Sequence, residues 1–209
     1  MRFALKFSVA GALLLAGTAA LAQEPAPYQS ARTGFDGTYQ RHFGFYVRPD
    51  LGFGYMSMAG PGGTVYGFSG LGGIAIGGAI RENSILAVHI IDSVAQDPSV
   101  SGSGFSGTAT GSSLTMWGIG PQYTYYFMPA NVYLSTTLAL TRLHVSDPAG
   151  SFDSDLGLGT RVAVGKEWWA SDHWGMGLAG HFSFSSNQNG AGDALTTWAL
   201  GVVFSATYN

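Results

Sequence analysis

The chain has 209 residues, of which only 10% are charged, whereas 32 are glycine and 13% are aromatic. An ordinary soluble domain has about 25% charged residues and about 7% glycine, so this chain is poor in charge and rich in glycine. The aromatic content excludes a disordered chain, and the lack of a regular G-x-y repeat excludes collagen. Because glycine also disfavours a helical bundle, the composition points to a β-sheet protein.

The first 22 residues have the features of a secretory signal peptide. Arg2 and Lys6 precede an uncharged apolar run over residues 7–21, and an A-x-A cleavage site ends at Ala22. The apolar run is shorter than the roughly 20 residues that a membrane-spanning helix needs. We therefore expect export and cleavage after Ala22. Loss of the two basic residues makes the formal net charge of −3 two units more negative.

Residues 23–41 are polar and contain two prolines, and we interpret them as a flexible periplasmic segment before one domain over residues 42–209. The chain has no cysteine, so an exported domain must be held by its core, its sheet or a bilayer. No basic patch is present, and we expect no nucleic-acid partner. We also expect neither a cofactor nor a metal ion, because the histidines are scattered and Asp147, Asp153 and Asp155 lack the spacing of a calcium loop.

Eight segments of this domain alternate between apolar and polar residues, and turn residues separate them. Most are longer than soluble strands, and they suit a tilted membrane strand, which needs about 9–11 residues to cross a bilayer. The segments cover residues 43–58, 65–79, 85–95, 113–128, 132–145, 155–168, 174–185 and 194–208.

The connections between these segments alternate in length. The short turns cover residues 81–84, 129–131 and 170–173. The longer, polar connections cover residues 59–64, 96–112, 146–154 and 186–193. This is the topology of an outer-membrane barrel, in which short turns face the periplasm and longer loops face the outside. The sequence therefore predicts an all-β protein: a closed, antiparallel, up-and-down transmembrane β-barrel of eight strands.

The alternation gives each segment one apolar face and one face of small or polar residues. In the segment 113–128, for example, Trp117 and Ile119 share one face, and Gly118 and Gly120 share the other. Since the glycine face also carries the charges, we expect it to line a narrow lumen while the apolar face meets lipid. Six ionisable residues fall on the inner face and predict a polar network that fills the lumen: Arg48, Asp50, His89, Arg161, Glu167 and His181.

Aromatic side chains gather near the ends of the segments. Amphipathic rings prefer the headgroup boundary of a bilayer, so this placement predicts two aromatic girdles. The residues expected at the membrane interface are Trp117, Tyr126, Phe127, Tyr133, Trp168, Trp169, Trp174, Trp198 and Tyr208.

The signal peptide, the eight segments, the run GIGPQYTYYF over residues 118–127 and the final VVFSATYN over residues 202–209 resemble small bacterial outer-membrane barrels of the OmpA/OmpX/OmpW type. The resemblance implies a protein of the Gram-negative outer membrane, in contact with outer-membrane lipids and lipopolysaccharide and inserted by the barrel-assembly machinery. We expect a monomer. In this family the last strand usually ends in an aromatic residue, whereas here Asn209 follows Tyr208.

The resemblance leaves three hypotheses for function. The first is a structural, envelope or surface-interaction role through the extracellular loops, chiefly residues 96–112, without enzymatic activity. The second is a porin-like narrow channel for small or hydrophobic solutes, similar to OmpW. The third is a lipid A-modifying enzyme, because lipid A deacylases are eight-stranded barrels with a His-x-Ser pair and an acid on the next strand.

The enzyme hypothesis rests on His181 and Ser183, with Asp193 at the spacing of the acid. Nucleophilic catalysis requires the serine, the base and the carboxylate within hydrogen-bond reach. In the deacylase family the His-x-Ser pair faces lipid, whereas the alternation here places His181 and Ser183 on the inner face. This difference disfavours the enzyme hypothesis.

Overall fold

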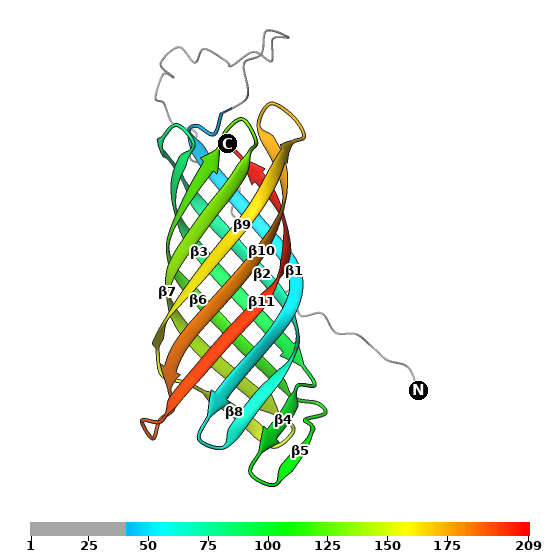
Figure 1. Cartoon of the computed structure of the whole chain (residues 1–209). Coiled ribbons are helices and arrows are strands. Elements are labelled where there is room, and N and C mark those ends of the chain that lie inside the picture. Colours follow the sequence, from blue (N-terminus) through cyan, green and yellow to red (C-terminus); the bar gives the residue numbers. More distant parts are fainter. Residues whose placement is uncertain (1–40) are drawn as a thin grey trace. The chain divides into compact units, whose positions relative to one another are not determined.

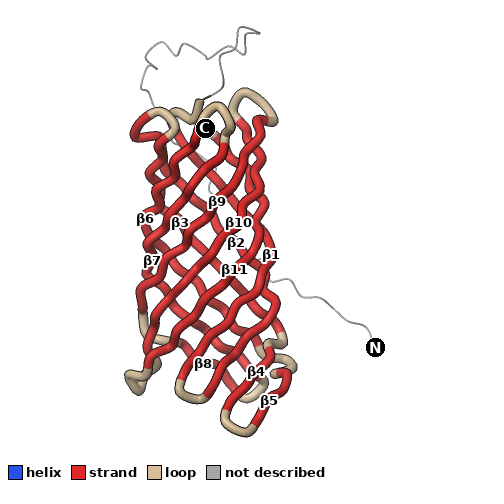
Figure 2. The backbone as a smooth tube through the Cα atoms, in the orientation of Figure 1, coloured by secondary structure: helices blue, strands red, loops and turns tan. Residues whose placement is uncertain are grey.

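The computed structural model describes residues 41–209. The predicted signal peptide (1–22) and all but the last residue of the predicted N-terminal segment (23–41) therefore lie outside the described residues. The described chain consists of strands joined by turns and loops (Figures 1 and 2). The strands are β1 (Phe45–Gly60), β2 (Gly63–Arg81), β3 (Ser84–Gln96), β4 (Ser99–Gly102), β5 (Phe105–Thr108), β6 (Ser113–Phe127), β7 (Val132–Asp147), β8 (Gly150–Asp153), β9 (Gly157–Trp169), β10 (Trp174–Gln188) and β11 (Ala194–Tyr208). Over residues 41–209, no helix has the length and apolar character to span a membrane.

Eight strands close into one antiparallel barrel. In the order β1, β2, β3, β6, β7, β9, β10 and β11, each strand pairs with the next, and β11 pairs back onto β1. Closure gives each of these strands two hydrogen-bonded neighbours, which a sheet requires where no water can reach its backbone. The predicted fold class, an eight-stranded antiparallel barrel, is confirmed.

The two ends of the barrel differ, and we name them by their connections. The turn end carries the connections between β2 and β3, β6 and β7, and β9 and β10, together with the start of β1 and the end of β11 (Figure 1). The loop end carries the other connections. There β4 pairs with β2 and β5 pairs with β4, while β8 pairs with β7. The predicted loop 96–112 thus folds into a hairpin that extends the β2 edge.

The prediction of a longer loop over residues 59–64 is wrong. β1 and β2 keep pairing as far as Gly60 and Gly63, which leaves only Pro61 and Gly62 between them. Gly63 has φ = 133°, a backbone conformation that residues with a side chain rarely adopt. This glycine lets the chain reverse within two residues.

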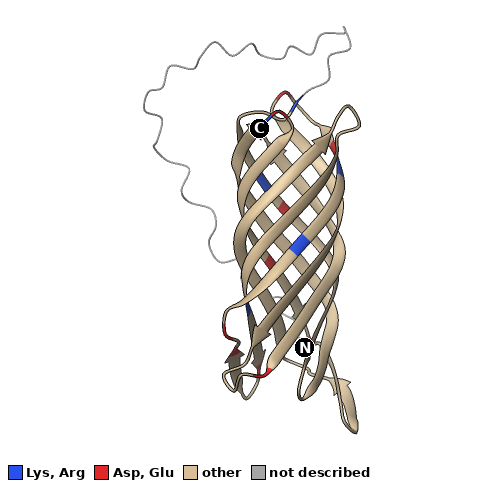
Figure 3. Ribbon diagram, turned by 60° about the vertical axis from the view of Figure 1, so that its left-hand side comes forward, with Lys and Arg blue, Asp and Glu red and all other residues tan. Residues whose placement is uncertain are grey.

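Side chains alternate between the inside and the outside of the barrel. Along β10, Gly175 and every second residue after it are buried, while Trp174 and its alternate neighbours are exposed. Large apolar side chains cover the outer surface, with Leu51 exposed to 74% and Phe68 to 76%. Charged residues lie mainly at the two ends (Figure 3). An apolar surface of this extent on every strand suits contact with lipid rather than water.

Glycines inside the barrel make room for larger side chains. A Cβ atom added at Gly73 would lie 2.7 Å from Nε2 of His89, and one at Gly165 would lie 2.6 Å from Cζ of Tyr133. Gly180, which faces outward on β10, would meet no atom within 4 Å. At Gly73 and Gly165 the lumen therefore has no space for a side chain.

Candidate functional site

All six ionisable residues expected on the inner face lie in the lumen, and none is more than 4% exposed. They come from four strands: Arg48 and Asp50 from β1, His89 from β3, Arg161 and Glu167 from β9, and His181 from β10. Alternation along each strand places these side chains inside, but their partners lie on other strands.

Asp50 on β1 lies close to side chains from two other strands of the barrel. Its Oδ1 accepts a hydrogen bond of 2.9 Å from Nη2 of Arg161, and its Oδ2 lies 3.6 Å from Nε2 of His89. Gln122 Nε2 lies 2.8 Å from Nδ1 of His89 and can only donate, so the network assigns the His89 proton to Nε2, facing Asp50. Thr137 also contacts the same Nδ1 at 2.9 Å. Asp50, Arg161 and His89 thus form a network across the lumen.

Arg48 is buried without a carboxylate partner among the described residues. Its Cζ lies 4.8 Å from the ring centroid of Tyr133 and 5.9 Å from that of Tyr46. Nη2 donates one long hydrogen bond of 3.5 Å to Oγ of Ser135, while Nε and Nη1 have no partner over residues 41–209. The tyrosine faces therefore provide the main stabilisation of this guanidinium.

Glu167 accepts hydrogen bonds from hydroxyl groups. Its Oε2 accepts from Thr207 Oγ1 at 2.8 Å and from the Tyr126 hydroxyl at 3.2 Å. The Tyr126 hydroxyl also lies 3.3 Å from that of Tyr46. Glu167 and Arg48 therefore share one tyrosine cluster without forming an ion pair.

The prediction that Tyr126 and Tyr133 lie at the membrane interface is wrong. Both are buried inside the barrel, with at most 1% exposure, and their ring centroids are 5.4 Å apart. Successive residues of a strand point to opposite faces, so Tyr126 must face inward where Phe127 faces outward. Their position at a strand end suggested a girdle, but the alternation places them in the lumen.

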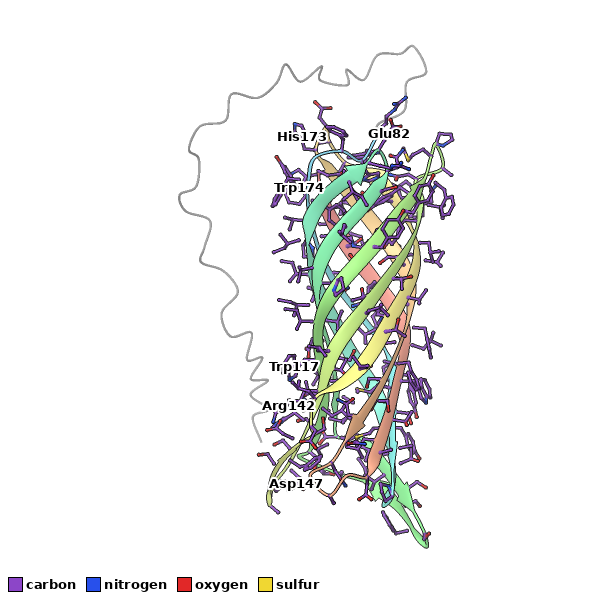
Figure 4. The ribbon with its side chains drawn as sticks, turned by 90° about the vertical axis from the view of Figure 1, so that its left-hand side faces the viewer. Glu82, Trp117, Arg142, Asp147, His173 and Trp174 are labelled. Atoms are coloured by element: carbon purple, nitrogen blue, oxygen red, sulfur yellow. The ribbon has the colours of Figure 1, made fainter. Side chains whose placement is uncertain are left out.

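Most of the other predicted interface aromatics lie on the outer surface. Trp174 lies near the turn end and Trp117 near the loop end (Figure 4). The rings of Trp174 and Tyr208 meet edge to face, with centroids 5.3 Å apart. Trp169 differs, because its ring lies against His42 with its Nε1 buried. The outward-facing set comprises Trp117, Phe127, Trp168, Trp174, Trp198 and Tyr208.

His42 closes the turn end of the lumen, a role that the sequence did not reveal. Its ring is fully buried and stacks on Tyr126, with centroids 3.5 Å apart. Nδ1 lies 2.7 Å from Oδ1 of Asn209, and Nε2 lies 2.8 Å from Oδ1 of Asn131. Burial lowers the pKa of His42 below its usual 6.5, although the carboxylate of Glu167 acts in the opposite direction. The side chain is therefore neutral at pH 7.

An apolar cluster lies in the loop half of the lumen, the half nearer the loop end, beside buried polar groups such as Asn187 and Thr141. This buried cluster contains Met56, Met58, Ala95, Leu114, Met116, Leu143, Leu195 and Ala199. Ser185 Oγ lies 3.4 Å from the Met116 sulfur. The inner-face alternation places these side chains inside, but it does not reveal that they pack into one apolar layer.

The residues of the enzyme hypothesis do not assemble into a triad. His181 and Ser183 face the lumen, and neither ring nitrogen of His181 has a hydrogen-bond partner over residues 41–209. Asp193 lies just before the start of β11 and accepts a hydrogen bond from Asn189. Gln188 pairs with Ala194, which places Asp193 level with Asn189, so at about 3.3 Å per residue Asp193 is roughly 25 Å from His181. The lipid-facing arrangement of the deacylases is therefore absent here.

Over residues 41–209, no group of three His, Cys, Asp or Glu side chains is placed to hold a metal ion. Asp147, Asp153 and Asp155, which lack the spacing of a calcium loop, do not form such a group within residues 41–209. Asp147 instead accepts hydrogen bonds from the backbone of its own turn, at Ala149 and Gly150. Asp153 lies 3.0 Å from His144.

No protein-family model matches the chain, and no curated protein matches its sequence. Among solved structures, the chain is similar to the Neisserial surface protein A, with 17% identity over 78% of this chain and 96% of that chain, and a TM-score of 0.52. It also matches the outer membrane protein OprG from Pseudomonas aeruginosa, with 10% identity over 82% of this chain and 100% of that chain, and a TM-score of 0.45. A third match is Ail, the attachment invasion locus protein of Yersinia pestis, with 9% identity over 78% of this chain and 99% of that chain, and a TM-score of 0.42.

The closed topology and the likeness to Neisserial surface protein A define the class. The chain has the fold of the small eight-stranded outer-membrane β-barrels, as the sequence resemblance implied. At 17% identity, this likeness describes the fold alone.

Proposed function

We propose that this protein is an integral outer-membrane barrel that acts through its surface, as an envelope or surface-interaction protein, and that it is neither a pore nor an enzyme. In this proposal the turn end faces the periplasm and the loop end faces outside. The outer strands contact outer-membrane lipids and lipopolysaccharide. The protein is exported through its signal peptide, inserted by the barrel-assembly machinery and remains a monomer.

The observation that carries the proposal is the contrast between the two faces of the barrel wall. Apolar side chains such as Leu51 and Phe68 are exposed on the outside, while the inside is packed with polar groups and glycines. A soluble barrel buries its apolar face, so this inverted arrangement suits a bilayer. Eight strands enclose a space that side chains roughly fill, which leaves surface contacts as the main route to function.

The loop end offers the contact surface. The β4–β5 hairpin continues the β2 edge beyond the barrel wall, and all four residues of β5 are exposed, with Phe105 at 55%. In the proposed orientation this hairpin is the most extended structure outside the membrane. It is therefore the first segment that a partner at the cell surface would meet.

Fractionation and surface labelling test the proposal. The full chain should appear in the outer-membrane fraction and migrate faster on gels before boiling than after it. A short epitope inserted between Gly102 and Phe105 should be labelled on intact cells, whereas the same epitope after Ala170 should require permeabilised cells. Recovery in the soluble periplasmic fraction, or the reverse labelling pattern, would contradict the placement.

A channel remains the second candidate because the lumen contains buried polar atoms without protein partners among the described residues. These include Nε of Arg48, Oε1 of Glu167 and both ring nitrogens of His181. Such atoms are usually satisfied by ordered water, and a hydrated lumen favours passage of small solutes. The purified protein in planar bilayers should nevertheless give no stable conductance. Large and steady single-channel currents would replace the surface proposal with the channel.

A further inference from the structure

The short segment before β1 closes the turn end of the lumen through a single histidine. Residues 41–44 precede the first strand, and His42 is the residue that inserts into the mouth. Its backbone N–H donates to Oδ1 of Asn83 at 3.1 Å, and its carbonyl accepts from the Asn83 N–H at 3.0 Å. With the ring contacts to Asn131 and Asn209, His42 bonds to three asparagines.

Each asparagine belongs to a different part of the turn end. Asn83 lies in the β2–β3 turn with φ = 61°, and Asn131 lies in the β6–β7 turn with φ = 51°. Asn209 follows β11, and its N–H donates to the carbonyl of His173 in the β9–β10 turn at 3.1 Å. His42 is therefore the common point that connects all three turns and the end of the last strand.

The hydrogen bonds of the ring depend on its protonation state. Both ring nitrogens face amide oxygens, which only accept, so this arrangement satisfies both contacts only with two ring N–H groups. A neutral ring has one N–H, and one amide must then turn to present its nitrogen. Nδ2 of Asn131 and Nδ2 of Asn209 are both buried without a partner among the described residues, so each is available for that role.

The charged groups around His42 act in opposite directions. Glu167 on β9 favours a cationic ring, while Arg48 on β1 disfavours it. Tyr126 on β6 stacks on the ring, and Trp169 lies 4.9 Å away. The exposed pair of Arg41 and Glu82 lies outside this enclosure, at a distance of 2.7 Å from each other. Burial of the ring lowers the pKa of His42 more than Glu167 and the two asparagine contacts raise it, so the enclosed form is the neutral one.

We propose that His42 is a proton-operated latch, which keeps residues 41–44 over the turn-end mouth when neutral and releases them when protonated. The enclosed ring binds a proton less readily than a ring in water, so protonation must favour the state in which the ring is exposed. The backbone contacts to Asn83 and one from Ala79 N–H to the Gly44 carbonyl at 2.8 Å are further attachments of the segment. Release gives water and small solutes access to the turn half of the lumen, which is the half nearer the turn end. The apolar layer of the loop half stays closed.

Thiol accessibility tests the latch, since the chain has no cysteine. Thr124 is fully buried on the inner face of β6 and its hydroxyl has no partner among the described residues, so Thr124→Cys removes no hydrogen bond seen there. Ala170→Cys in an exposed turn provides the reference rate. A small charged methanethiosulfonate is applied to each folded full-length variant at about pH 7.5 and about pH 5.5. The labelling rate of the Thr124→Cys variant is then divided by that of the Ala170→Cys variant at the same pH.

We expect this ratio to rise on acidification by up to about tenfold per pH unit below 6.5, which is the limit for one proton. His42→Gln is neutral at both pH values and should keep the ratio low at both. His42→Ala should give a high ratio at both. An unchanged ratio in the protein that retains His42, or the same rise in His42→Gln, would overturn the latch.

Hydrogen exchange provides a second measurement if Thr124→Cys does not fold. After correction for intrinsic rates, the Asn83 amide, which bonds to the His42 carbonyl, should exchange faster at acid pH. The Ala170 amide bonds to the Trp174 carbonyl at 2.7 Å in the β9–β10 turn and serves as a control without a contact to His42. Equal acceleration of both amides would indicate general loosening and reject a local latch. Neither experiment depends on which end of the barrel faces the periplasm.

Discussion

The two halves of the lumen are built on the same strands but differ in their main interactions. The turn half contains the Asp50–Arg161 ion pair and Glu167, which accepts a hydrogen bond from a tyrosine, beside a buried apolar cluster. The loop half contains the apolar cluster of Met56, Met116 and their neighbours. In both halves, the alternation of strand residues determines which side chains point inward. It does not specify how the interior is stabilised.

The difference separates two sources of stability. In the turn half, each buried charge needs its partners, so the loss of one partner leaves the remaining charge unpaired in a low-dielectric interior. In the loop half, stability comes from packing, and a substitution costs what its lost volume costs. Substitutions in the two halves should therefore differ in how well a second substitution repairs the damage.

The largest effect is expected for Asp50→Ala. Arg161 then loses its hydrogen-bond acceptor and His89 loses its neighbouring carboxylate while both remain buried, which should cost about 3–5 kcal/mol of unfolding free energy. Urea unfolding in phospholipid vesicles, followed by tryptophan fluorescence, measures the change. Asp172→Ala, in an exposed turn, is the control and should change the unfolding free energy by less than about 0.5 kcal/mol.

The double variant Asp50→Leu with Arg161→Leu sharpens this result. Removal of both charges leaves no unpaired guanidinium at this pair, so the double variant should be more stable than Asp50→Ala alone. If the double variant is instead less stable by the sum of two single effects, the pair does not act as a unit. The ionic description of the turn half would then be wrong.

The next effect concerns the apolar layer. Met116→Ala leaves a cavity in a fully buried cluster and should cost about 2–5 kcal/mol, whereas Met116→Leu should cost less than about 1.5 kcal/mol. Met176→Ala is the matched control, because Met176 is 44% exposed on the outer face of β10. Similar losses for Met116→Ala and Met176→Ala would show that the loop half is not packed like a core.

A smaller effect should reveal how narrow the lumen is. Gly73→Ala would place a methyl group 2.7 Å from His89 Nε2 and 3.2 Å from Arg161 Nη1, and overpacking of this kind costs about 1–3 kcal/mol. Gly180→Ala has no atom within 4 Å of the new Cβ and should be neutral or slightly stabilising. Equal unfolding free energies for the two variants would contradict the explanation given for the inner glycines.

The sequence was sufficient to predict the barrel and the side of the wall for most strand residues, because alternation is a local property. It was not sufficient to predict partners: Asp50 and Arg161 are 111 residues apart, and only the strand order brings them together. The prediction for Tyr126 was wrong because a position at a strand end does not determine which face a side chain points to, whereas the alternation does. His42 was missed because its partners Asn83, Asn131 and Asn209 lie in turns and at a strand end, outside any periodic pattern.

The smallest expected effect is on the pH dependence of the unfolding free energy, and it arises from His42 at the turn end. The enclosed His42 has a lowered pKa, so the unfolded chain binds a proton below 6.5 more readily than the folded chain. The contribution of His42 to the unfolding free energy is therefore fully present above about pH 6.5 and declines as the pH falls below it, until the folded pKa is reached.

Urea unfolding of wild type and His42→Gln at a series of pH values between about 7.5 and 5 isolates this slope. His173, exposed in a neighbouring turn, supplies the control: His173→Gln should keep the wild-type slope, whereas His42→Gln should flatten it. If both variants keep the wild-type slope, the pH dependence arises deeper in the turn half, and the His42 latch is not its source.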